Sequence, residues 1–277
     1  MKLEDLNKTA LQIRKVVIKS IGDLGIGHLG GSMSIVEVLT ALYFAVMEGV
    51  EPENLEREDR DRLVLSKGHA GPSLYAVLAL KGFFPLDWFE TLNRGGTRLP
   101  SHCDRNLTPG IDMSTGSLGQ GLSAAIGLAL GSRMNGYSNW IYAIIGDGES
   151  QEGQVWEAAM AASHYKVDRL IAFTDYNKMN IDGYTRDIMN LDDLGAKWSA
   201  FNWHVQRVNG HSIENIIEAV GRAKKETGRP SMIILDTIKG KDCSFAEGRF
   251  DSHNMPVKPE QRDEALEILK QREASHA

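Results

Sequence analysis

The strongest chemical signal in this sequence is a carboxylate that directly follows an apolar stretch. One such stretch ends in Gly146-Asp147-Gly148, and a later one leads to Asn177. Because the carboxyl ends of parallel strands meet at one edge of a sheet, we expect Asp147 and Asn177 to lie close together. Mg²⁺ takes a few oxygen ligands from protein and completes about six with phosphate and water. The pattern therefore predicts a magnesium site made by Asp147, Asn177 and the main-chain carbonyl of Met179.

Glycines near these residues suit an anion that shares the metal. Gly148 and Gly116 would let backbone N–H groups face a diphosphate, and the helix N-terminus that follows adds partial positive charge. Taken by itself, Gly146-Asp147-Gly148 is more often a strand-to-turn junction, since Asp and Gly are common turn residues. The second polar residue after a strand, Asn177, favours the metal interpretation.

Together these pieces resemble the signature of thiamine diphosphate enzymes. The loops GHLGG, LSKGHA, LPSHCD and STGSLGQG narrow the resemblance to the transketolase family over nearly the whole chain. The resemblance implies a thiamine diphosphate-binding fold, with thiamine diphosphate and Mg²⁺, or another divalent cation such as Ca²⁺ or Mn²⁺, as cofactors. It also implies transfer of a two-carbon ketol unit from a ketose to an aldose, with sugar phosphates as substrates.

The same resemblance implies a partner chain. In transketolases the glutamate that activates the cofactor's aminopyrimidine belongs to a pyrimidine-binding domain, which follows the region that this sequence covers up to Ala277. We therefore expect a separate C-terminal subunit that carries this domain, in an α2β2 heterotetramer with each site at an interface. The chain should not complete the reaction without that subunit.

Four of the eight histidines stand in loops with transketolase-like surroundings. The resemblance places His69 and His253 against the diphosphate, and His28 and His102 near the donor and acceptor hydroxyls. His28, His69 and His102 are the catalytic candidates, because imidazole titrates near neutrality and can shuttle protons. A single histidine is more often structural, and His253 departs from the Trp-His-Gly context common in the family. The other four are assigned to structural or exposed positions: His164, His204, His211 and His276.

Further cofactor contacts follow from the resemblance. Gly116 and Leu118 would pass beside the cofactor, with Ser117 standing where the family has proline. Glu152 matches a glutamate in a carboxylate network that links the two active sites of the dimer, although a helix N-terminal carboxylate explains it equally well. The full set of expected cofactor contacts is His69, Gly116, Leu118, Asp147, Gly148, Glu152, Asn177 and His253.

These side chains require a scaffold of parallel strands. Apolar strand-like runs at 140–145, 170–174, 204–208 and 232–235 alternate with helical patterns near 118–135, 152–164 and 212–226. Helices are also expected near 3–20, 33–47 and 71–81, with a short strand at 62–65. Such alternation is typical of an α/β fold with a mostly parallel sheet flanked by helices on both faces. We expect one domain over residues 1–277, which ends in a charged helix from Pro259 onward.

Composition excludes several classes of function. A net charge of −6 and a pI near 5.8 give no broad attraction to nucleic acid or to an anionic membrane. The apolar runs fall short of the roughly 18 residues of a membrane span, and the charged amphipathic N-terminus is unlike a signal peptide. Cys103 and Cys243 form no CxxC pair, which suits a reducing compartment. We therefore expect a cytoplasmic protein that binds neither nucleic acid nor membrane.

Three rival interpretations stay open. A subunit of another thiamine diphosphate enzyme, similar to 1-deoxyxylulose-5-phosphate synthase or to an E1 dehydrogenase, would share the metal motif but is disfavoured by the GHLGG, SKGHA and SHCD loops. A non-catalytic binding protein could retain the cofactor fold. A nicotinamide-binding Rossmann domain is the weakest, because no GxGxxG follows the first strand.

Overall fold

Five parallel strands form the main sheet of the computed structural model, which describes residues 1–275. They lie in the order β2 (Arg62–Leu65), β3 (Ile141–Gly146), β4 (Leu170–Tyr176), β6 (Ser231–Asp236) and β5 (His204–Asn209). Every strand coincides with an apolar run expected from the sequence, to within two residues at each end. The register sets Gly146 opposite Asp175 and Tyr176 opposite Asp236, so the carboxyl ends of β3, β4 and β6 are level.

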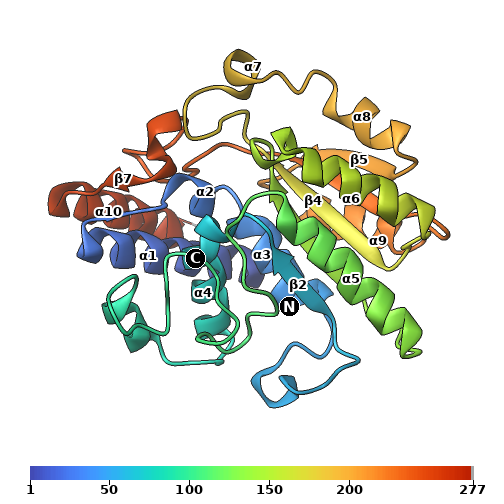
Figure 1. Ribbon diagram of the computed structural model, residues 1–277. Coiled ribbons are helices and arrows are strands. Elements are labelled where there is room, and N and C mark those ends of the chain that lie inside the picture. Colours follow the sequence, from blue (N-terminus) through green and yellow to red (C-terminus); the bar gives the residue numbers. More distant parts are fainter. Residues whose placement is uncertain (276–277) are drawn as a thin grey trace.

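Helices cover both faces of this sheet, as the sequence predicted (Figure 1). Tyr142 and Ile144 pack in a core with helices α1 (Leu3–Leu24), α3 (Val36–Ala41), α4 (Gly71–Leu80) and α9 (Ile213–Ala223). Ala143 and Ile145 pack in a second core with α5 (Gln120–Met134), α6 (Gly153–His164) and α8 (Leu194–Ala200). Because both faces are buried, the inner strands β3, β4 and β6 are largely apolar rather than alternating, whereas the edge strand β5 is polar and partly exposed.

The helix expected over 33–47 is broken into pieces. Its place is taken by α2 (Gly30–Met33), α3 and a π-helical turn, η1 (Leu42–Val46). The break falls at Ser34, whose hydroxyl donates to the Gly31 carbonyl at 3.1 Å and to the Asp175 carboxylate at 2.6 Å. A side chain that bonds to its own backbone and to a distant strand competes with a regular helix, a conflict that periodicity does not reveal.

Several short elements had no sequence prediction. They are α7 (Thr185–Ile188), α8, and an antiparallel ribbon between β1 (Ile26–Gly27) and β7 (Met255–Pro256). Segments this short have too few residues for a periodic signal. The ribbon matters for function, because it joins the loop before His28 to the loop after His253.

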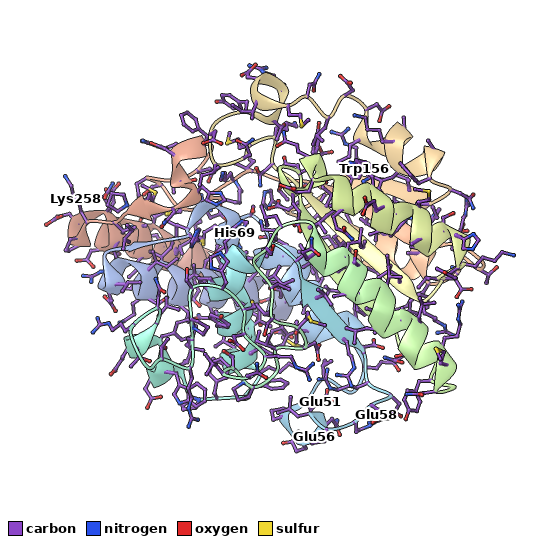
Figure 2. All side chains as sticks on the ribbon, in the orientation of Figure 1. Glu51, Glu56, Glu58, His69, Trp156 and Lys258 are labelled. Atoms are coloured by element: carbon purple, nitrogen blue, oxygen red, sulfur yellow. The ribbon has the colours of Figure 1, made fainter. Side chains whose placement is uncertain are left out.

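The charged C-terminal segment forms helix α10 (Pro259–Ser275), which packs along α1. His276 and Ala277, the end of the segment predicted as helix, lie outside the described residues. Within residues 1–275 no helix combines the length and apolarity needed to cross a membrane. The acidic segment at 51–59 is a surface loop, and Figure 2 shows Glu51, Glu56 and Glu58 on it, well away from His69.

The glycine-rich start of α5 lets this helix approach β2 closely. A Cβ on Gly121 would lie 2.7 Å from Ser66 Cα, whereas one on Gly127, in the same helix, would meet nothing within 4 Å. We expect Gly121→Ala to destabilise the purified chain by about 1–3 kcal/mol through overpacking. Gly127→Ala, the matched control, should stabilise it by about 0.5–1 kcal/mol through reduced chain entropy. Denaturant unfolding of the two variants measures both effects, and equal free energies of unfolding would contradict the packing argument.

Candidate functional site

A cavity of about 330 Å³ opens at the carboxyl ends of β2, β3, β4 and β6. It is lined by the loops that follow those strands, by the N-terminal glycine loop and by the loop before α5. Most of the residues predicted to contact the cofactor line it: His69, Leu118, Asp147, Gly148, Glu152, Asn177, Met179 and His253. The motifs are scattered along the chain, and the parallel sheet gathers them at one edge.

Asp147 and Asn177 lie on adjacent loops at this edge. The Asp147 carboxylate accepts the Gly148 N–H at 2.8 Å and also the N–H of Lys178, the residue after Asn177. The Asn177 amide oxygen accepts the Met179 N–H at 3.1 Å. Lys178 has φ of +67°, a left-handed conformation that folds this loop tightly around Asp147. Lys178 thus connects the two expected metal ligands, because its N–H is bonded to Asp147 and it directly follows Asn177.

Burial makes ionisation of the Asp147 carboxyl group unfavourable. Its side chain is 1% exposed, and this burial, followed by the charge of nearby Asp175, raises the pKa of Asp147 to about 7. A cation at this carboxylate would offset both effects. Among the described residues no three His, Cys, Asp or Glu side chains converge to hold a metal. An ion here would therefore need amide, main-chain or ligand oxygens as well, which suits Mg²⁺.

Asp175, which the sequence analysis missed, is the centre of the polar network under the cavity. Its side chain is fully buried at the end of β4. It accepts hydrogen bonds from Ser34 at 2.6 Å, Lys67 at 2.5 Å, Asn177 at 3.0 Å and the Thr237 hydroxyl. Burial would raise the pKa of Asp175, but the Lys67 charge and these donors lower it below its ordinary value. The hydrogen bond from the Asn177 NH₂ group to Asp175 fixes the orientation of this amide, whose oxygen accepts the Met179 N–H.

Two buried ammonium groups also line the cavity, and neither was predicted. Lys67 donates to the Gly31 carbonyl at 2.9 Å in addition to Asp175. Lys239 donates to the Asn180 carbonyl at 2.9 Å, and its Nζ lies 3.5 Å from His253 Nδ1. Burial, and next the charge of Lys67, lower the pKa of Lys239 to about 8. A lysine after a strand carries no local signal of this role, and only the strand order reveals it.

The four motif histidines form one cluster beside the cavity. Their ring centroids lie 5.3 Å apart for His28 and His102, 5.5 Å for His28 and His253, and 4.6 Å for His69 and His253. The β1–β7 ribbon and the 3₁₀ turn η6 (Phe250–His253) bring His253 into this group. The structure therefore places His253 with the other three despite its unusual sequence context.

Burial disfavours the protonated, charged form of all four imidazoles. Burial, followed by His102, lowers the pKa of His28 to about 4, and burial together with Lys239 lowers the pKa of His253 to about 3. Burial also lowers the pKa of His69, to well below its ordinary value, and that of His102. A neutral imidazole offers one N–H donor and one acceptor nitrogen, which suits the binding of sugar hydroxyls.

Gly116 and Glu152 are placed differently from the other residues that were expected to contact the cofactor. Gly116 does not line the cavity but packs under His102, where a Cβ would lie 2.8 Å from His102 Cδ2 at a φ of +138°. Glu152 is an exposed side chain at the cavity rim. The buried carboxylate nearby is Glu149, which accepts from Ser66 and from the N–H groups of Gly119 at 2.9 Å and Gly146 at 3.0 Å. Glu149 thereby ties together the loops that follow β2 and β3.

The fold and site together define a class: an α/β domain with a polar, partly charged cavity at the carboxyl edge of its parallel sheet. A family model described as "Transketolase, thiamine diphosphate binding domain" matches residues 6–272. The chain therefore belongs to the transketolase family and corresponds to its thiamine diphosphate-binding part.

Relatives of similar length carry the names of transketolase subunits. The chain is 60% identical to a 6-deoxy-6-sulfo-D-fructose transketolase subunit of Clostridium sp. (strain MSTE9), over 92% of this chain and 93% of the relative. It is 39% identical to an apulose-4-phosphate transketolase subunit of Actinobacillus succinogenes, over 96% of each chain. The fold matches a transketolase of Pichia stipitis in complex with sedoheptulose 7-phosphate, with a TM-score of 0.87 and 27% identity. That match covers 99% of this chain but 45% of the solved one.

The buried histidines predict a pH dependence of stability. The folded-state pKa of His253 lies below its ordinary value of 6.5, so the unfolded chain takes up a proton before the folded chain does. Its contribution to stability is complete above pH 6.5 and is lost as the pH falls toward 3. We expect His253→Gln to reduce the fall in melting temperature between about pH 6.5 and about pH 4.5. His164→Gln, at an exposed position, should keep the wild-type slope, and an unchanged slope in His253→Gln would contradict the assignment.

Proposed function

We propose that this chain is the cofactor-binding subunit of a transketolase, which transfers a two-carbon ketol unit from a ketose to an aldose. In this proposal residues 1–277 form a single thiamine diphosphate-binding domain and lie in the cytoplasm. The observation that carries it is the convergence of a buried carboxylate, an amide and two histidines on one cavity, with the other two motif histidines packed against that pair. Membership of the transketolase family supplies the reaction class.

The cavity fits a diphosphate. Two glycines keep it open, because a Cβ on Gly148 would lie 2.8 Å from Asn180 Cβ and one on Gly31 would lie 3.1 Å from His69 Nε2. Lys239 has two neighbours for its three donors, which leaves one N–H for a phosphate oxygen. His69 lies on the same wall. The ammonium groups of Lys67 and Lys239, which are buried and line the same cavity, are stabilised when an anion binds beside them.

The metal in this proposal is Mg²⁺ or another divalent cation. Asp147, Asn177 and the Met179 carbonyl would hold it against the diphosphate. Asp175, by binding the Asn177 NH₂ group, would orient the amide oxygen toward the ion. The raised pKa of Asp147, about 7, supports this role, because burial and the charge of Asp175 outweigh the compensating hydrogen bonds and the Lys67 charge.

Thiamine diphosphate, when bound, supplies the carbanion chemistry that breaks and remakes the ketose carbon–carbon bond. The chain's own residues position the sugars. His28 and His102 would bind hydroxyls next to the reacting carbons, and His28 Nδ1 lies 3.3 Å from the Ser101 hydroxyl, which orients its ring. His69 and His253 would contact the cofactor, and Leu118 would pack beside it. Neutral rings can accept and return protons during each half-reaction.

A separate C-terminal subunit completes the site in this proposal. The chain spans a little under half of the full-length transketolases it matches, 42% of the human enzyme for example, while its relatives of equal length are named as subunits. An α2β2 heterotetramer would place each cavity at an interface. The exposed Glu152 would then meet the partner rather than solvent.

The donor in this proposal is a ketose with an anionic terminal group, and a sulfonate is favoured over a phosphate. The relative named for 6-deoxy-6-sulfo-D-fructose is 60% identical to this chain, whereas the relative named for apulose 4-phosphate is 39% identical. The two terminal groups differ in charge and in hydrogen-bond geometry, so a direct comparison of donors separates them.

Removal of the metal ligand tests the cofactor site. We expect Asp147→Ala to weaken binding of thiamine diphosphate with Mg²⁺ by about 100-fold or more, since an anchoring carboxylate is lost. Calorimetric titration into the complex of the chain with its partner measures this. The control is Asp187→Ala, at an exposed aspartate in the nearby α7. Equal affinities in both variants would rule out the proposed metal site and favour a non-catalytic binding protein.

Reconstitution tests the reaction and the donor. The purified chain should show no ketol transfer, and the addition of the C-terminal subunit should restore it. With the pair assembled, 6-deoxy-6-sulfo-D-fructose should give a kcat/KM at least about tenfold higher than fructose 6-phosphate, which corresponds to about 1.4 kcal/mol. Full activity of the purified chain would refute the split-site proposal, and a preference for the phosphorylated donor would refute the sulfonate assignment.

A further inference from the structure

A second cluster of buried charges lies outside the cavity, on the other side of the loop that carries Lys239. Arg14 of α1 is 1% exposed and lies 2.8 Å from a Glu37 carboxylate oxygen and 3.2 Å from an Asp242 oxygen. Neither contact has hydrogen-bond alignment, so the guanidinium acts mainly as a charge. Glu37 also contacts His211, which follows the carboxyl end of β5. A groove of about 500 Å³ along α1 ends at this cluster but contains none of the motif residues.

His211 bridges two partners with its two ring nitrogens. Nε2 accepts the main-chain N–H of Ile238 at 2.8 Å, and Nδ1 lies 3.1 Å from a Glu37 carboxylate oxygen. Because a backbone N–H can act only as a donor, Nε2 carries no proton, so the proton is on Nδ1 and points to Glu37. Burial raises the pKa of Glu37, but Arg14 and then His211 lower it below its ordinary value. The carboxylate therefore holds the ring in a single tautomer.

Ile238 directly precedes Lys239, whose backbone is fixed on several sides. The Gly240 N–H donates to the Gly30 carbonyl at 3.0 Å, and the Gly248 N–H donates to the Lys239 carbonyl at 2.8 Å. The hydrogen bond from the Ile238 N–H to His211 adds to these two backbone contacts, and its acceptor is a side chain. It fixes the peptide between Thr237 and Ile238, one residue before the peptide that joins Ile238 to Lys239, and a rotation at this point of the chain would shift the backbone that carries the Lys239 ammonium group.

We propose that His211 is a positioning residue for cofactor binding, which acts through Lys239 by holding the Ile238 peptide. The inference rests on the proposed function, because it takes the cavity to be a diphosphate site. Glu37 and Arg14 set the tautomer that makes the contact possible. The network thus connects the rigid helices α1 and α3 to one ammonium group in the cavity.

The two amide side chains separate the two contacts of His211. Glutamine places an oxygen near the position of Nε2 and can still accept from Ile238, whereas asparagine places its NH₂ near Nδ1 and keeps only the contact with Glu37. We expect His211→Asn to weaken binding of thiamine diphosphate with Mg²⁺ to the full complex by about tenfold. His211→Gln should stay within about threefold of wild type, although both variants lose some thermal stability.

The control is His204→Asn, at the start of β5, the strand that His211 follows. His204 also has a hydroxyl partner, Ser231 at 3.2 Å, and a carboxylate neighbour, Glu226 at 3.8 Å, but it lies at the opposite end of β5. This variant should bind the cofactor with wild-type affinity. Hydrogen exchange gives a readout independent of the cofactor: the Ile238 amide should be protected in wild type and in His211→Gln but exchange faster in His211→Asn. Equal loss of affinity in the Asn and Gln variants would overturn the proposal.

A double-mutant cycle tests whether the effect passes through Lys239. In a Lys239→Met background, His211→Asn should cause no further loss of cofactor affinity, since the group that it positions is gone. An additional tenfold loss in that background would overturn the proposal. If Lys239→Met leaves affinity unchanged while Asp147→Ala abolishes binding, the proposed function survives and this inference fails. If wild-type complex binds no thiamine diphosphate, both fail.

Discussion

A fully buried carboxylate at the end of the central strand places a demand on everything around it. Asp175 has no exposed surface, and an unpaired charge in such a position would cost far more than a domain can spare. It is satisfied by donors from the break between α2 and α3 and from the loops after β2, β4 and β6, namely Ser34, Lys67, Asn177 and Thr237. These loops must therefore converge at one point, and the cavity is the space immediately above that point. The hydrogen bonds that stabilise this arrangement of loops therefore also form the floor of the site.

The cavity is asymmetric in charge, and that asymmetry suits a metal-bound diphosphate. On one side, Asp147 resists ionisation because it is buried next to another carboxylate. On the other side, Lys239 resists protonation because it is buried next to another ammonium group. A divalent cation at the first side and a diphosphate at the second would relieve both conflicts together. The protein is thus prepared electrostatically for a pair of ions, which explains how an acidic chain with a net charge of −6 can hold a polyanion.

The histidine cluster depends on the short antiparallel ribbon of β1 and β7. The two-residue strands β1 and β7 join segments from opposite ends of the chain, and this ribbon brings His253 to within 5.5 Å of His28 between ring centroids. Mutual repulsion and burial keep the rings neutral, so they act as hydrogen-bonding groups rather than as cations. Outside the cavity, His211 also acts as a hydrogen-bonding group. It connects the Ile238 N–H to the Glu37 carboxylate.

The sequence by itself determined the sheet, most of the helices and the placement of Asp147 and Asn177 after neighbouring strands. Apolar runs mark β3, β4 and β6 most clearly because a strand buried on both faces is apolar along most of its length, and Asp147 and Asn177 stand out because each follows such a run. The split of the 33–47 helix, the role of Asp175, the two cavity lysines and the position of His253 were decided by the tertiary structure. Their partners are distant in the chain: Ser34 meets Asp175, Lys67 meets Gly31, and Lys239 meets Asn180. A local pattern records the preference of a segment for its own conformation, whereas the pairing of buried polar groups depends on which strand ends lie side by side.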